Sequence, residues 1–480
     1  MPAATHTPRT WRLATEAPFG AALPALMQDG TLLFHEASTT HWWQLAPDAF
    51  GQYDDGTFTQ LADAPGDFSP TWNASAVLLD GRYLLQGGEY NGDSNAQVEQ
   101  TQGAIYDPVA GSWQALGAPT SWTTVGDASG IVLPDGSFML ADCCSSQEAI
   151  LDPSTLTWTP TGAGKADYNS EESWAQLQDD SILTADAGFE STSADLMRSE
   201  RYTPSTGMWT SAGDLPVELS DNPRSYEVGP AIARPDGTVV AIGGTPHNAL
   251  YNEAAQTWTA LEDTPSGFAT VDGPGVTLPN GDAMFATAPY APEFAPGTVY
   301  YEVSGTTFTS VPTTENAASD PSYVNFLLVL PTGEILHTDS SQLVEIYTPA
   351  PGFAANAGPV ILDEPTLIGS GAEPPTAPVP TLYRGRSYTL PMQRMNGVDL
   401  GAVYGDDVQT STNYPIVQLT ATASGHVWYC RTHDATDRSI SPTEVGLATF
   451  DIPESVEGGT AQIAAIANGI PSAALTVNVK

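Results

Sequence analysis

One repeating unit dominates this sequence: a short apolar strand, a tight turn that usually ends in Gly, and a second apolar strand. Asp-Gly and Asn-Gly turns between apolar runs predict β-hairpins, because the primed turns that join such strands need positive φ. The turns are about fifty residues apart, which is the period of kelch repeats. Seven copies occur, at residues 26–34, 76–88, 130–142, 175–186, 231–244, 275–287 and 326–338.

A second signature follows the hairpins: a strand that leads into a turn, often with Tyr or Pro, and then a strand that carries Trp. It occurs at residues 104–113, 149–158, 200–209 and 249–258, and at 299–308 with Phe308 in the Trp position. Two hairpins give four strands, which make one propeller blade. The sequence therefore predicts an all-β fold whose main part is a seven-bladed kelch-type β-propeller.

The seventh repeat lacks its last strand, because no Trp strand follows residues 344–353. Residues 9–18 contain Trp11 and precede the first hairpin, so they can supply that strand. A ring completed by both ends of the propeller leaves no exposed sheet edge. We therefore expect Trp11 to lie in the last blade, and the propeller to cover residues 1–360.

Beyond residue 360 the pattern changes. Residues 363–380 are rich in Pro and are typical of a linker. About 100 residues of short alternating strands follow, which predicts an immunoglobulin-like β-sandwich over residues 361–480. We expect its strands at 386–392, 415–422, 426–432, 446–452 and 473–479.

The charge balance limits the partners. Acidic residues outnumber basic ones by 56 to 14, which gives a net charge of −42. Binding of nucleic acid or of an anionic membrane needs clustered Lys and Arg, so we expect neither. P-loop, GxSxG, HExxH and dinucleotide-binding motifs are absent, which excludes the commonest enzyme classes. The partners that remain are small molecules and carbohydrates.

The chain has no stretch of eighteen apolar residues, and its first residues lack the apolar segment of a secretory signal. We therefore expect a cytoplasmic protein, or a secreted one if the sequence starts after processing. The three cysteines, Cys143, Cys144 and Cys430, form neither a disulfide framework nor a CxxC metal pair. We expect free thiols, at least one of them buried, although the adjacent pair can also form a vicinal disulfide.

The order of propeller and sandwich resembles galactose oxidase and glyoxal oxidase, the copper-radical oxidases. The segments GAVYGDD (401–407), TNYP (412–415) and GHVWYCRTHD (425–434) are more similar still to kelch-repeat proteins related to galactose oxidase. In the oxidases, copper is held by two Tyr and two His, and one Tyr is crosslinked to a Cys. Imidazole and phenolate suit a tetragonal copper ion, and the crosslinked ring stores the radical.

The resemblance assigns only part of that copper site to this chain. Tyr323 matches one Tyr, whereas Tyr226 is displaced by about two positions from the other. Val324 stands where one His is expected, and His426 is the nearest match for the other. The crosslinking Cys has no counterpart. We therefore expect no copper-radical cofactor, and the sequence identifies no other cofactor or metal.

Propellers place ligand sites at the mouth of the central channel, where the inner strands begin. The segments just before the hairpins would bring acidic and aromatic side chains, among them Asp272, to this mouth. We expect His426 to reach over from the second domain. The candidate catalytic residues are Glu171, Glu172, Tyr226, Glu227, Tyr323 and His426, and the candidate ligand-binding residues are Asp127, Trp174, Asp320 and His433.

This group of residues admits several roles. Paired carboxylates can act as general acid and base, as in glycoside cleavage, or can hold a divalent metal together with His426 or His433. Carboxylates beside aromatic rings can also bind a sugar or a cationic small molecule. A purely structural alternative is that the acids cap turns.

We predict a propeller directed at a small molecule or carbohydrate, acting as a non-oxidative hydrolase, lyase or cyclase. A non-catalytic propeller that binds a glycan or a partner is the alternative. A copper-radical oxidase is the second alternative.

Overall fold

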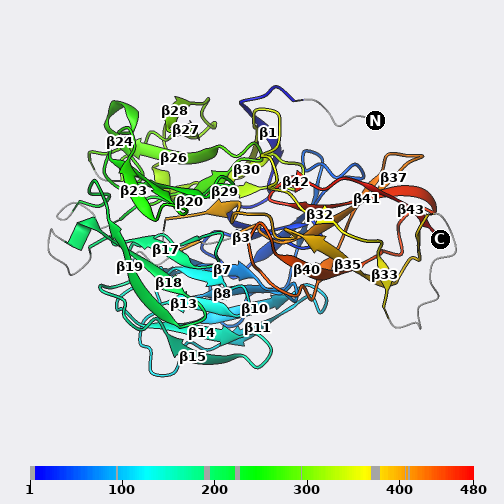
Figure 1. The fold of residues 1–480 in the computed structure, drawn as a ribbon, viewed down its shortest axis with the longest axis horizontal. Helices are drawn as coiled ribbons and strands as arrows, with labels where there is room; N and C mark the ends of the chain where they lie inside the picture. The colour runs from blue at the N-terminus through cyan, green and yellow to red at the C-terminus, as the bar shows by residue number, and fades with distance from the viewer. Residues whose placement is uncertain are drawn as a thin grey trace.

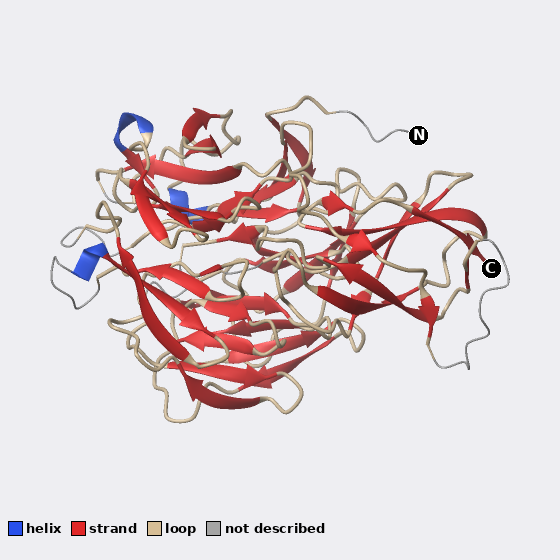
Figure 2. Cartoon of the chain, in the orientation of Figure 1, coloured by secondary structure: helices blue, strands red, loops and turns tan. Residues whose placement is uncertain are grey.

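The computed structural model describes residues 6–92, 96–188, 195–221, 227–292, 294–368, 379–405, 407–408 and 411–480. The chain is all-β, as Figure 2 shows, and this confirms the predicted fold class. Its helices in the described residues are single 3-10 turns: η1 (Asp195–Met197), η2 (Pro265–Gly267) and η3 (Ser322–Val324). Across these ranges no helix is long and apolar enough to span a bilayer.

Seven antiparallel sheets, each with a core of four strands, follow one another along the chain as the blades of a β-propeller (Figure 1). Blade 1 contains β2 (Ala21–Leu26), β3 (Leu32–Glu36), β4 (Trp42–Ala46) and β5 (Thr57–Gln60). Blade 2 contains β7 (Ala74–Val77), β8 (Tyr83–Gln86), β10 (Gly103–Asp107) and β11 (Ser112–Leu116). Blade 3 contains β12 (Gly130–Val132), β13 (Phe138–Ala141), β14 (Glu148–Asp152) and β15 (Thr157–Thr161). The turns between the first two strands of each blade are the turns of the sequence repeat.

Blades 4 to 6 have the same order. Blade 4 contains β16 (Ala175–Gln176), β17 (Ile182–Ala185), β18 (Arg198–Thr203) and β19 (Met208–Asp214). Blade 5 contains β20 (Ala231–Ala233), β21 (Thr238–Ile242), β22 (Asn248–Asn252) and β23 (Thr257–Ala260). Blade 6 contains β25 (Gly275–Thr277), β26 (Ala283–Pro289), β27 (Val299–Ser304) and β28 (Thr307–Ser310). Two short additions are β6 (Pro70–Thr71), which pairs with β9 (Tyr90–Asn91), and β24 (Phe268–Ala269), which pairs with β26.

Blade 7 is built from both ends of the propeller. It consists of β29 (Phe326–Val329), β30 (Ile335–Thr338), β31 (Leu343–Thr348) and β1 (Thr10–Glu16). Trp11 of β1 lies opposite Tyr347, and its indole N–H donates a 2.8 Å hydrogen bond to the Pro312 carbonyl. Arg12 binds Glu334 of blade 7 at 2.8 Å and Asp54 of blade 1 at 2.7 Å. The predicted position of Trp11 is therefore confirmed.

The Trp residues of the outer strands connect each blade to the blade before it. The indole N–H of Trp113 donates to the Ala62 carbonyl at 2.9 Å, and that of Trp158 donates to the Gly117 carbonyl at 2.7 Å. Trp258 donates in the same way to the hydroxyl of Ser199 at 2.8 Å. These residues recur because every blade needs the same contact with its neighbour.

Residues beyond 359 form two further sheets, to the right in Figure 1, with an apolar cluster between them. One contains β32 (Val360–Ile361), β33 (Thr366–Leu367), β35 (Ser387–Gln393), β39 (Thr432–His433) and β40 (Val445–Asp451). The other contains β34 (Thr381–Leu382), β37 (Ile416–Ala421), β38 (Val427–Cys430), β41 (Gly459–Ala467), β42 (Ile470–Pro471) and β43 (Leu475–Val479). The boundary at 360/361 stays a prediction, and most of the predicted linker lies outside the described residues.

One segment of the C-terminal part leaves these two sheets and joins the propeller. Its strand β36 (Ala402–Val403) pairs with the inner strand β25 of blade 6. The Tyr404 hydroxyl donates to the Tyr323 carbonyl, and the Tyr404 ring stacks on Phe326 with 5.9 Å between ring centroids. We call residues 399–414 the channel segment. It carries Asp407 to the point where the inner strands begin.

Candidate functional site

A cavity of about 820 Å³ lies where the inner strands of the propeller begin. Every blade contributes at least one side chain from just before, or at the start of, its inner strand. These side chains are Leu23, Trp72, Asp127, Glu171, Glu227, Asp272 and Phe326, in blade order. The cavity is therefore the mouth of the central channel.

The wall of this cavity is acidic. Its carboxylates are Glu89, Asp127, Glu171, Glu227, Asp272 and Asp407, and the described residues that line it include neither Lys nor Arg. The imidazole of His35 donates to the Thr39 carbonyl, and burial lowers its pKa to about 4, so His35 is neutral at pH 7. The described lining residues thus include six acids and no Lys or Arg, and His35 is uncharged.

Burial and mutual repulsion keep protons on part of this cluster. Burial, and then the neighbouring carboxylates, raise the pKa values of Asp127, Asp272 and Asp407 well above the ordinary range. The same causes raise the pKa of Glu171 to about 7, with Glu89 as its strongest charged neighbour. At neutral pH the cluster therefore contains both carboxylic acids and carboxylates. A cation that enters the cavity would lower the pKa values of the carboxylic acids, which would then lose their protons.

The channel segment brings Asp407 against Asp272. A methyl group in place of the Gly405 hydrogen would lie 1.9 Å from Asp272 Oδ1, so the approach requires glycine. Asp272 accepts from the Gly273 N–H at 2.9 Å, and Asp407 Oδ1 accepts from the Val408 N–H at 2.6 Å. The second oxygen of the buried Asp407 has no hydrogen-bond partner among the described residues.

Aromatic rings form the other side of the wall. Tyr323 lies 5.6 Å from Trp72 and 5.5 Å from Phe294 between ring centroids. Trp72 also contacts Tyr90, with 5.6 Å between their rings. The cavity therefore offers flat apolar faces beside carboxylates, an arrangement that suits organic cations and sugars.

Left-handed backbone conformations are concentrated around the mouth. Leu23, Trp72 and Phe294 have bulky side chains, which rarely adopt positive φ. Such conformations cost free energy and cluster at functional sites. The non-glycine residues of the described wall with positive φ are Leu23, Ser38, Trp72, Glu171, Asp272, Phe294 and Ser340.

The structure brings several of the predicted site residues together and leaves others apart. Asp127, Glu171, Glu227 and Tyr323 all line the cavity, together with Asp272. Tyr226 lies outside the described residues. The site function of all these residues stays a prediction.

Glu172 and Trp174 point away from the mouth. The buried Glu172 accepts from the ammonium of Lys165 at 2.8 Å and from the hydroxyl of Thr184 at 3.1 Å. Trp174 is fully buried and packs on Trp209, with 5.9 Å between their rings. Placing these two residues at the mouth was wrong, because adjacent residues of this segment face opposite sides of the backbone.

The two histidines assigned to the site lie elsewhere. His426 binds Glu457 at 2.6 Å and packs edge-on against Phe50, so the expectation that it reaches into the channel is wrong. His433 binds Asp434 at 2.7 Å and Asp451 at 3.3 Å in the C-terminal part.

Asp320 also lies away from the wall. Its carbonyl accepts from the Thr298 hydroxyl at 2.7 Å, and burial together with Asp339 raises its pKa to about 6.

Three elements of the wall were missed from sequence. Glu89 and Tyr90 follow the second strand of blade 2, in the run QGGEY, whereas only residues before the first strand were considered. Trp72 was assigned to no role. Asp407 was missed because the sequence does not reveal that Ala402 and Val403 pair with blade 6. The acidic pair directly after the apolar run GAVY was the available signal.

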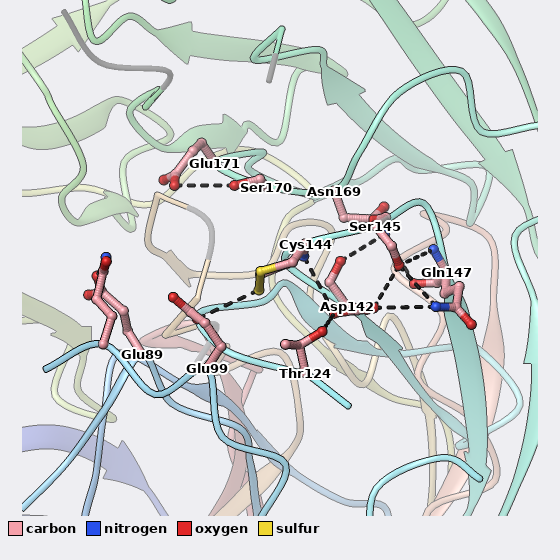
Figure 3. Close-up of a disulfide and its surroundings, with 12 residues drawn as sticks. Glu89, Glu99, Thr124, Asp142, Cys144, Ser145, Gln147, Asn169, Ser170 and Glu171 are labelled. Carbon is pink, nitrogen blue, oxygen red and sulfur yellow. Dashed lines mark hydrogen bonds between the residues drawn. A yellow bond between two sulfur atoms is a disulfide. The ribbon is translucent and has the colours of Figure 1, made fainter. Parts of the chain in front are cut away.

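A vicinal disulfide joins Cys143 and Cys144, so the expectation of free thiols at these positions was wrong. Figure 3 shows Glu89, Glu99 and Glu171 around it. Cys143 is buried and Cys144 is exposed. Since the sulfurs are bonded to each other, neither acts as a thiolate ligand for a metal.

A second acidic cluster lies behind the mouth in blade 4. Asp167, Asp186 and Glu200 are close enough to share one cation. The Lys165 ammonium supplies this positive charge, and it lies 2.7 Å from Asp167 and 2.8 Å from Glu200. Because this charge comes from the chain itself, the cluster is part of the fold.

No family model matches the chain, and no curated protein matches it either. A fungal alcohol oxidase of the AA5 family, solved in complex with copper, is similar in fold with a TM-score of 0.54 and 14% identity. The alignment covers 99% of this chain and 100% of that chain. A virginiamycin B lyase from Staphylococcus aureus aligns with a TM-score of 0.48 and 11% identity, over 71% of this chain and 99% of that one. The first of these likenesses supports an oxidase-like fold.

The side chains at the mouth do not fit the copper site implied by the resemblance to the oxidases. Val324 lies at the wall, and His35, bound to a carbonyl, is the only imidazole among the described lining residues. Cys430 is buried in the C-terminal part, while Cys143 and Cys144 are bonded to each other. The part of the mouth that the structure describes therefore offers neither a second imidazole nor a cysteine for a Tyr–Cys crosslink.

Proposed function

We propose that the channel mouth binds a small organic molecule that carries a positive charge. The observation that carries this proposal is the wall itself: five carboxylates face one cavity, whose described lining residues include no Lys or Arg, and they are Glu89, Asp127, Glu171, Asp272 and Asp407. Burying like charges is costly unless a partner neutralises them. An ammonium group entering the cavity would supply that partner.

Two features favour an organic cation over a bare metal ion. Among the described residues, the clusters tight enough for a metal do not include three carboxylates of the mouth. The cavity of about 820 Å³ is also in the size range of sites for small organic ligands. The rings of Trp72, Tyr323 and Phe294 would cover the apolar part of such a ligand.

A non-oxidative enzyme at the same mouth is the second candidate. The pKa of Glu171 is raised to about 7, whereas unperturbed carboxyl groups are fully ionised at that pH. A carboxyl group that holds its proton near neutral pH beside ionised neighbours is what a general acid requires. In this case Glu171 would donate the proton, and a neighbouring carboxylate would accept one, as in hydrolysis or elimination.

The binding proposal is tested by thermal unfolding with putrescine, choline, galactose and Ca²⁺ as probes. We expect putrescine or choline to stabilise the wild type and to lose this effect in the Asp407→Asn variant. Asp263→Asn is the matched control, because Asp263 is an exposed acid on an outer loop that pairs with His247. Stabilisation by galactose or Ca²⁺ alone would contradict an organic cation as the ligand.

A further inference from the structure

The disulfide between Cys143 and Cys144 lies in the turn that follows β13, and its two sulfurs have different surroundings. Cys143 is 1% exposed, and its N–H donates to the Val125 carbonyl at 3.0 Å. Cys144 is exposed at the surface of the same turn. A reagent from solvent therefore meets the exposed Cys144 rather than the buried Cys143.

The turn is held in place independently of the sulfur–sulfur bond. The Asn169 side chain donates to the carbonyls of Ser145 at 2.9 Å and Gln147 at 3.1 Å. The Ser145 hydroxyl donates to Asp142 at 2.6 Å, as Figure 3 shows. Opening the disulfide would leave all these hydrogen bonds intact, so the turn has the means to survive reduction.

A carboxyl group lies next to the buried sulfur. Glu99 Oε2 is 3.6 Å from Cys143 Sγ. Gly126, with φ +67°, permits this contact, because a Cβ there would lie 2.2 Å from Glu99 Oε2 and 2.6 Å from Cys143 Sγ. No residue with a side chain fits at position 126 without separating the two groups.

Glu99 is surrounded by acids. Burial and the carboxylates of Glu89 and Asp142 raise its pKa to about 7, opposed by a hydrogen bond from the backbone of Asp127. Glu171, which lies just before the inner strand of blade 4, interacts with Glu89 and Glu99 in the same group of acids. Glu99 is therefore protonated in a substantial fraction of molecules at neutral pH, next to the sulfur that would leave during disulfide opening.

We propose that the Cys143–Cys144 disulfide is a thiol-exchange site at which Glu99 protonates the leaving sulfur. A small thiolate attacks Cys144 Sγ and forms a mixed disulfide, while the bond to Cys143 breaks and its electron pair goes to Cys143 Sγ. Cys143 takes the proton from the Glu99 carboxyl group and becomes a thiol that donates back to the carboxylate. A second thiolate attacks the outer sulfur of the mixed disulfide, which releases the oxidised reagent and leaves the Cys144 thiolate.

The proposal is tested on the full-length protein with glutathione as the thiol, followed by alkylation and peptide mass analysis. We expect the glutathione adduct on Cys144 and the alkyl group on Cys143, with the buried Cys430 unmodified. An adduct on Cys143, or a disulfide that stays closed in millimolar glutathione, would overturn the proposal. This part of the test uses the wild type alone, so it does not depend on any variant that fails to fold.

The role of Glu99 is tested by the pH dependence of the exchange rate, normalised to the concentration of glutathione thiolate. In the wild type the normalised rate should fall as pH rises through about 7, because Glu99 loses the proton it supplies. Glu99→Gln should be slower by about tenfold or more at pH 6 and independent of pH, since an amide cannot supply the proton.

The matched control is Glu89→Gln, which removes a neighbouring acid without touching the sulfur. It should keep the fall in rate but move it to lower pH, because Glu89 helps to raise the pKa of Glu99. Identical profiles for the wild type and Glu99→Gln would exclude Glu99 as the proton donor.

Discussion

At the scale of single residues, neighbours in sequence have opposite roles. Glu171 has a φ of 63° and lines the cavity, whereas Glu172 is fully buried beside Lys165. The run NSEESW does not reveal which acid faces the mouth, because the left-handed turn at Glu171 decides it. The sequence places this acidic segment at the mouth, where Glu171 lies, but it does not distinguish Glu171 from Glu172.

Lys165 should be essential for stability. Replacing it by Met would leave Asp167, Glu172 and Glu200 buried around an apolar side chain. Removing one partner of a buried ion pair typically costs about 3–5 kcal/mol, and we expect a loss of that size in urea unfolding at pH 8. The loss should shrink at pH 5, where the carboxylates can take up protons. An equal loss at both pH values would contradict the proposed charge balance.

Glu171 should make the free protein less stable as pH rises. Its pKa is about 7 in the folded state, so between the ordinary carboxyl value and pH 7 the folded state holds more protons than the unfolded state. The free energy of unfolding therefore decreases with pH through that interval. Between pH 5 and 8, Glu171→Gln should make the decrease in the free energy of unfolding smaller by about 1 kcal/mol. This value is reduced to allow for the partial exposure of Glu171 to solvent.

Urea unfolding of both proteins at pH 5 and 8 measures this difference, with Asp263→Asn as the exposed control. A variant whose stability depends on pH as steeply as the wild type would show that Glu171 is ionised in the folded protein. It would also remove the argument for Glu171 as a general acid.

At the scale of elements, the channel segment completes the site. It connects the C-terminal part to blade 6 through β36 and places Asp407 in the wall. The resemblance implies that a residue of the C-terminal part reaches the mouth. The sequence favoured His426 for this position, whereas the structure has Asp407 there. The pairing of two residues of β36 with β25 is a tertiary contact, and hairpin and alternation signals are local, so they could not locate it.

Gly405→Ala should disturb this element selectively. The added methyl group would meet Asp272 Oδ1 and push the channel segment away from the wall. We expect a loss of about 1–3 kcal/mol in unfolding and at least tenfold weaker binding of putrescine. Gly117→Ala is the matched control, because a Cβ at Gly117 has nothing within 4 Å. Unchanged binding by Gly405→Ala would separate the channel segment from ligand recognition.

At the scale of the whole molecule, the repeats explain why the fold was predictable. Each blade carries its own hairpin turn, and most blades carry a Trp in the outer strand, so seven local signals agree on one architecture. The closure of the ring by β1 followed from the missing strand of the last repeat. The inward face of the ring was less predictable, because its side chains come from loops of all seven blades.

Deleting residues 1–18 should open the ring. It would remove β1 together with the packing of Trp11 on Tyr347 and Tyr300 and the Arg12 link to blade 1. We expect a loss of about 3 kcal/mol or more, visible as a lower unfolding temperature. A truncated protein with an unchanged unfolding temperature would contradict the closure of blade 7 by β1.

The proposed role of the mouth as an acidic site for an organic cation is tested most directly by calorimetric titration of putrescine. The titration is carried out at pH 5, 6.5 and 8, in buffers of different ionisation enthalpy. We predict that binding strengthens with pH and releases protons, because the ligand displaces them from carboxyl groups with raised pKa, and that galactose gives no such signal. Binding of putrescine that is independent of pH and buffer, or no binding at pH 8, would contradict the claim.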